Sequence, residues 1–95
     1  MTHIVFASRE LANTILREVA ATPFGSVWVF FEPDNPANSV AYNEGADGRC
    51  MIAHPFSEED RDWLEAYMAE WIATGQVQVL DRQPEDWVSK GEGEI

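Results

Sequence analysis

The chain has 95 residues, of which 45% are hydrophobic, and its formal net charge is −11. This length fits one domain with a modest core, and a single cysteine, Cys50, excludes an internal disulfide. No run approaches the roughly 18 apolar residues of a membrane-spanning helix, and residues 1–8 lack the basic region and apolar length of a signal peptide. We therefore expect a soluble cytoplasmic protein.

The negative charge is concentrated in the second half of the chain. Residues 1–56 hold six acids and three bases, whereas residues 57–95 hold eleven acids and three bases. Such a chain is repelled by nucleic acid and by anionic membranes, and is attracted to basic protein surfaces. We expect no direct contact with nucleic acid or membrane. The simpler interpretation is that the charge only maintains solubility.

The first half of the chain reads as strand, helix, strand. Residues 2–7 are rich in β-formers, and Ser8 can cap a helix over residues 9–21 whose apolar side chains recur at helical spacing. Residues 26–32 are the strongest predicted strand. Both of its faces are apolar, which is typical of a central strand covered on both sides, or of one covered on one side and packed against a partner on the other.

Two weaker strands follow, at residues 39–43 and 49–54. The loop between them, residues 44–48, contains Asp-Gly, which favours a hairpin turn. After the next helix, residues 76–80 alternate between apolar and polar side chains and predict a final strand at a sheet edge. Beyond it, Trp87 and Val88 are expected to fold back onto the domain.

The order is therefore β-α-β-β-β-α-β. Local hairpins and two amphipathic helices predict an α+β fold over residues 1–88, with a mostly antiparallel sheet, both helices on one face, and a flexible acidic tail over residues 89–95. The second face of the sheet would then be partly open. Trp28 and Phe30, or the side chains on the opposite face of the same strand, would form a hydrophobic patch there.

One long helix, residues 57–75, is predicted to organise the fold. Ser57 is a good N-cap and Gly75 a good C-terminal stop. Its apolar stripe, which includes the aromatic line Trp63, Tyr67 and Trp71, is interpreted as a core-facing surface. Its opposite side carries five carboxylates and no basic residue: Glu58, Glu59, Asp62, Glu65 and Glu70.

The acidic side of this helix is the sequence feature that points to a function. From Glu58 to Glu70 the helix rises about 18 Å, a length that roughly five phosphates occupy along one DNA strand. The helix alone could therefore mimic one strand of a duplex. A second row of charge would come from Asp34, Glu44 and Asp47, or from a second copy of the chain.

No pattern typical of catalysis is present. Cys50 and His54 share one face of a predicted strand, but about 13 Å of strand separates them, too far for a nucleophile and its base. No Cys/His spacing fits zinc, and no glycine-rich loop fits a phosphate. We therefore expect no enzymatic activity, no catalytic residue, no cofactor and no metal.

These features favour a small acidic binding protein that occupies a basic, nucleic-acid-binding site on another protein. In type it resembles the inhibitors made by phages and mobile elements, such as anti-CRISPR proteins and other nucleic-acid mimics. The five helix carboxylates would contact the partner, with Trp28 and Phe30, or Trp87, as apolar anchors. The alternatives are a homo-oligomeric module, such as a homodimer that pairs through the open sheet face, and an immunity protein that neutralises a basic toxin.

Overall fold

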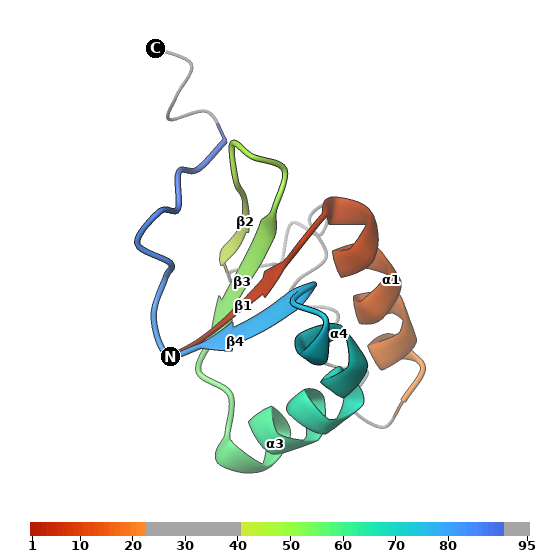
Figure 1. Ribbon diagram of the computed structural model, residues 1–95. Coiled ribbons are helices and arrows are strands. Elements are labelled where there is room, and N and C mark those ends of the chain that lie inside the picture. The colour runs from red at the N-terminus through yellow and green to blue at the C-terminus, as the bar shows by residue number, and fades with distance from the viewer. Residues whose placement is uncertain (23–40, 91–95) are drawn as a thin grey trace.

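A four-stranded antiparallel sheet organises the part of the chain that the computed structural model describes, residues 1–22 and 41–90 (Figure 1). Across the sheet, the strands are β2 (Ala41–Glu44), β3 (Cys50–His54), β1 (Thr2–Phe6) and β4 (Val77–Leu80). The helices are α1 (Arg9–Ala20), α3 (Glu58–Tyr67) and α4 (Ala69–Ala73). The prediction of a small α+β fold with an antiparallel sheet is confirmed. The strand predicted over residues 26–32 lies outside the described residues.

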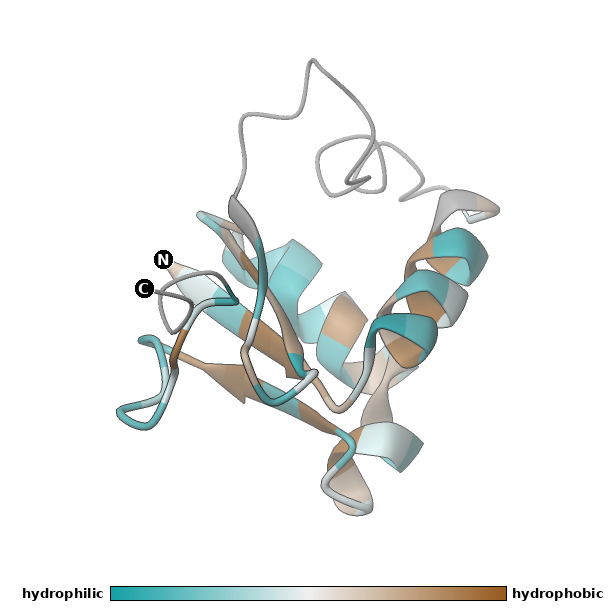
Figure 2. Ribbon diagram, turned by 90° about the horizontal axis from the view of Figure 1, so that it is seen from above, coloured by the Kyte–Doolittle hydropathy of each residue, from teal (hydrophilic) through white to brown (hydrophobic). Residues whose placement is uncertain are grey.

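The alternation of side chains along β1 divides the core in two. Ile4 and Phe6 pack with Ile15 of α1 and Leu64 of α3 in one cluster, whose buried members are at most 4% exposed. Val5 points to the other face of the sheet, because successive strand residues face opposite ways. Figure 2 shows hydrophobic residues along the strands, whereas α1 alternates between hydrophobic and hydrophilic residues.

The predicted helix caps and hairpin turn are present. The hydroxyl of Ser8 accepts a hydrogen bond from the Leu11 N–H at 3.1 Å, and that of Ser57 accepts one from the Asp60 N–H at 3.1 Å. Between β2 and β3 the turn closes through hydrogen bonds across residues 45–49, with Gly48 at φ 92°. Only glycine adopts that backbone conformation without strain.

The prediction of one continuous helix over residues 57–75 is wrong. The helix is interrupted at Met68, whose backbone lies at φ −94° and ψ 11°, and Figure 1 shows the ribbon changing direction between α3 and α4. The Met68 side chain is 1% exposed in the main core cluster. The change of direction returns the chain to the edge of the sheet, where Gly75, at φ 79°, leads into β4.

Residues 81–90, which we call the strap, run from β4 to the β2–β3 hairpin. The Trp87 side chain is 7% exposed and packs on Val5 and Met51, which confirms that Trp87 folds back. The strap is also tied to the hairpin by hydrogen bonds from the Ala46 N–H to the Val88 carbonyl, 2.8 Å, and from the Lys90 N–H to the Glu44 carbonyl, 2.7 Å.

The strap covers part of the second sheet face, which was expected to be partly open, while Gln78, the partner of Val5 on that face, is exposed. Val5 and Met51 are each 3% exposed, because the indole of Trp87 covers them. Ser89 pairs with Gly45 in an isolated antiparallel bridge.

No helix in the described ranges has the length and apolar character needed to cross a bilayer.

Candidate functional site

The predicted acidic row is shorter in the structure than in the sequence interpretation. Glu58, Glu59 and Asp62 are exposed on α3 and have no ion-pair partner among residues 1–22 and 41–90. Glu70 lies on α4, beyond the interruption at Met68. The expected straight row of five carboxylates is therefore wrong. The part on α3, from Glu58 to Glu65, spans about 10 Å, or roughly three phosphates of one strand.

Arg61 neutralises part of the charge on this surface. Its guanidinium donates to the carboxylate of Glu65 at 3.2 Å and to that of Asp81 at 2.8 Å. These contacts raise the pKa of Arg61, with Asp81 contributing most, and Arg61 lowers the pKa of Asp81. Arg61 thereby joins α3 to the first residue of the strap. Because Asp81 is 83% exposed, the pair contributes little stability.

A shallow depression of about 710 Å³ lies between the start of β1, α3 and the strap, and we call it the acidic depression. It brings together three of the five predicted helix carboxylates and leaves out Glu59 and Glu70. Its lining consists of Met1, Thr2, Phe56, Glu58, Arg61, Asp62, Glu65 and Asp81. Thr2 and Asp81 lie 56 and 23 residues from Glu58 in the sequence, and no helical or strand periodicity connects them with it, so the sequence alone does not predict that they line this site.

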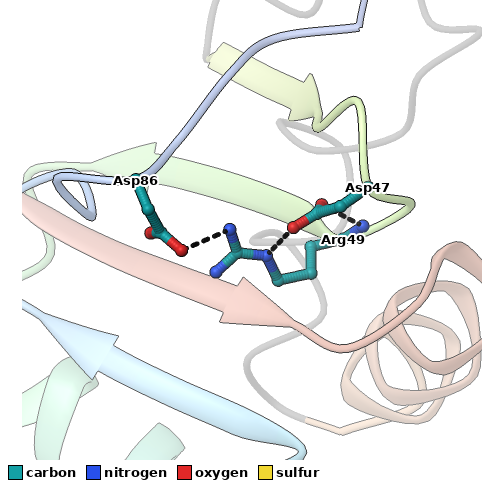
Figure 3. Close-up of polar contacts among 3 residues, drawn as sticks. All are labelled: Asp47, Arg49 and Asp86. Atoms are coloured by element: carbon teal, nitrogen blue, oxygen red, sulfur yellow. Dashed lines mark hydrogen bonds and ion pairs between the residues drawn. The ribbon is translucent and has the colours of Figure 1, made fainter.

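Two residues of the second predicted acidic row, Glu44 and Asp47, form ion pairs with basic residues of the chain itself. Arg49 lies between Asp47 and Asp86, with nitrogen–oxygen distances of 2.6 and 3.3 Å (Figure 3). Hydrogen bonding to the backbone N–H and then to the side chain of Arg49 lowers the pKa of Asp47. Glu44 is the last residue of β2 rather than a loop residue, and its carboxylate lies 3.7 Å from the Lys90 ammonium.

Glu44 therefore connects the hairpin to the strap, whereas Asp47 bonds to Arg49 within the hairpin, and neither lines the acidic depression. The structure does not join them to the α3 carboxylates in one surface row. Asp34, the third residue of the predicted second row, lies outside the described residues.

The aromatic residues of the described chain are mainly structural. Trp87 is too buried to anchor a partner, and the Arg49 guanidinium carbon lies 5.3 Å from its ring centroid. Trp63 and Tyr67 stack with ring centroids 5.2 Å apart and pack against the main core, in agreement with the core-facing interpretation. Trp28 and Phe30 lie outside the described residues.

The described residues hold no group of three or more carboxylate, imidazole or thiol side chains that could bind a metal ion. Cys50 is a buried thiol at the start of β3. Comparison with protein-family models, with curated protein sequences and with solved structures finds no significant match for this chain. The case for a function therefore depends on the geometry and charge of its own residues.

Proposed function

We propose that this protein is a small, non-enzymatic inhibitor that uses the α3 surface to occupy a basic, nucleic-acid-binding site on another protein, in the manner of phage and mobile-element inhibitors. One observation carries the proposal. Glu58, Glu59 and Asp62 are exposed on an ordered helix without ion-pair partners among the described residues. The one guanidinium on that helix is already bound by Glu65 and Asp81.

The exposed carboxylates would affect both the rate and the specificity of binding to a basic partner. Unpaired carboxylates held on a helix attract a basic partner over long range and orient its approach. With a Debye length of about 8 Å at physiological ionic strength, these charges act together, because they lie within about 6 Å of one another along α3. The helix would occupy the positions of roughly three phosphates of a single strand, so the proposed target is a site for a short stretch of one strand.

The proposal includes the rest of the expected architecture. In it, α1 and α3 both lie on one face of the sheet. This arrangement is supported by the core cluster, in which side chains of α1 and α3 pack against the same strand residues. A cytoplasmic location is supported by the cysteine count, since a single cysteine, Cys50, leaves this chain without an internal disulfide.

The test is affinity capture from a bacterial lysate with the tagged protein, followed by two elution steps. We expect a nucleic-acid-binding protein that is released by single-stranded DNA added as a competitor. It should also be released at about 0.5 M salt, where the Debye length is about 4 Å. A partner that stays bound through both steps would contradict the proposal, because its contact would be neither electrostatic nor at a nucleic-acid site.

A further inference from the structure

We propose that the outer edge of β4 is a dimerisation surface, at which a second copy of this chain adds its own β4 antiparallel, so that the two sheets join into one. β4 is the outermost strand on the side of α4, and among the described strands it pairs with β1 alone (Figure 1). The inference does not depend on the proposed function, because it uses no carboxylate of α3.

The ladder between β1 and β4 determines which backbone groups of β4 point outward. The Ala7 N–H donates to the Gln76 carbonyl at 2.8 Å, and the two strands continue in register from there. Hydrogen-bonded and non-hydrogen-bonded pairs alternate along an antiparallel ladder. Gln78 therefore bonds to β1, whereas the N–H and carbonyl groups of Val77 and Val79 point outward. No described residue forms a hydrogen bond with these outward groups.

The two edges of the sheet differ in how they are protected. At the β2 edge, the strap bonds to the end of the strand through the Lys90 N–H and the Glu44 carbonyl. Natural proteins commonly block a free edge with a lysine, a proline or a bulge. Residues 76–80, with the sequence QVQVL, contain neither lysine nor proline, and their pairing with β1 is regular. The β4 edge is therefore open to another strand.

The absence of charge along this edge favours a second copy as the occupant. Residues 71–80 carry no charge and are the longest uncharged run of residues 57–95, in a chain with a net charge of −11. Two copies repel each other over most of their surface, and this strip lets them meet without placing carboxylates opposite one another. A basic segment of another protein would find no carboxylate along the strand.

The helix side of the same edge is also mainly apolar. A shallow depression of about 440 Å³ lies beside β4, and small side chains of α4 form much of its wall. The second copy can therefore approach β4 without meeting a large side chain of α4. The lining consists of Glu65, Ala69, Ile72, Ala73 and Val79.

One antiparallel register places both outward positions opposite strand residues. Its two-fold axis passes through Gln78, so that Val77 lies opposite Val79 of the second copy and each such pair exchanges two backbone hydrogen bonds. Moving the axis by one residue would bring in Gly75, whose φ is 79°, or Asp81, which follows the strand. With the axis at Gln78, the two exposed Gln78 side chains face each other, and their amides can donate and accept in turn.

Sedimentation equilibrium measures the association directly. Because β4 has four residues and the contact is small, we expect a weak monomer–dimer equilibrium between roughly 10 µM and 1 mM. Raising the salt concentration from about 0.05 to 0.5 M should strengthen the dimer at least about threefold, because it screens the like charges. Salt should weaken binding to a basic partner, so the two proposals fail separately. A monomer at all these concentrations, or species larger than a dimer, would overturn the inference.

Two cysteine variants test the register. Gln76 and Gln78 are both exposed, and Cys50 is buried in both variants. Across the axis the two Gln78 Cα atoms would lie about 4.5 Å apart, within reach of a disulfide. The two Gln76 Cα atoms would lie about 13 Å apart, beyond that reach. We expect Gln78→Cys to form a covalent dimer under mild oxidation at least about tenfold faster than Gln76→Cys. Equal rates would overturn the register.

Two lysine variants with the same change in net charge test the contact without a covalent bond. Gln78→Lys places two like charges directly opposite each other, which destabilises a strand pair, and should weaken the dimer roughly tenfold or more. Gln76→Lys places its charge opposite Leu80 of the second copy and should change the affinity less than about threefold. Far-ultraviolet circular dichroism should show an unchanged fold in both. Equal effects of the two variants on dimerisation would overturn the inference.

Discussion

Replacing Trp87 with alanine should destabilise the protein more than any surface substitution. The side chain is 7% exposed and covers Val5 and Met51. A buried aromatic removes about 150–250 Å² from water, which at about 25 cal/mol per Å² sets an upper bound of about 4–6 kcal/mol. Measured Trp→Ala changes cost about 3–5 kcal/mol. We expect a loss of about 3 kcal/mol in the free energy of unfolding, because the strap can partly collapse onto the exposed sheet.

Trp87→Phe is the matched control for this prediction. The indole Nε1 of Trp87 is buried and has no hydrogen-bond partner among the described residues. Phenylalanine keeps most of the apolar contact and removes this unsatisfied donor, whose burial costs about 1–3 kcal/mol. We therefore expect Trp87→Phe to change stability by less than about 1 kcal/mol.

Urea denaturation followed by far-ultraviolet circular dichroism measures both variants without relying on tryptophan fluorescence. For a chain of this size the total stability is about 5–14 kcal/mol, so a loss of about 3 kcal/mol should shift the midpoint by more than about 1 M urea. If Trp87→Ala unfolds within about 0.5 M of the wild type, the strap does not cover the second sheet face as described.

Three further predictions concern the hairpin, the strap and β3. Gly45→Ala should cost about 1 kcal/mol, because the added Cβ would lie 3.1 Å from Cη2 of Trp87; the cost should fall in a Trp87→Ala background. Asp86→Asn should change the urea midpoint very little, by about 0.5 kcal/mol or less, since Asp86 is 76% exposed where it meets Arg49. Burial lowers the pKa of His54 below 6.5, so the unfolded chain takes up the proton first. Stability should therefore be fully present above that pH and decrease as the pH falls, and His54→Gln should flatten this part of the pH–stability curve.

Local signals in the sequence predicted the elements that depend on local physics. Ser8 and Ser57 cap their helices as expected, because capping involves only the next three residues. The hairpin turn at Gly48 follows from the Asp-Gly pair. The interruption at Met68 was not predictable, since neither proline nor glycine marks it and the apolar spacing continues through it.

The candidate site was only partly predictable, because some of its residues are brought together by long-range strand pairing rather than by local sequence. Helical spacing places Glu58, Asp62 and Glu65 on one side of α3, and the structure gathers all three in the acidic depression. Thr2 and Asp81 join them through the sheet, because β1 and β4 are neighbours, and no local pattern encodes that pairing. The expectation that Asp47 would extend the acidic row was wrong, because its partner Arg49 is two residues away in the same turn.

The central claim is that the α3 carboxylates bind a basic surface on another protein. Isothermal titration of the captured partner with the wild type and with a triple variant, Glu58, Asp62 and Glu65 each replaced by lysine, tests it most directly. We predict a loss of at least about a hundredfold in affinity, because each attractive charge becomes repulsive, with an unchanged circular dichroism spectrum. Equal affinity of the two proteins for the partner would contradict the claim, and the charge of α3 would then serve only to keep the protein soluble.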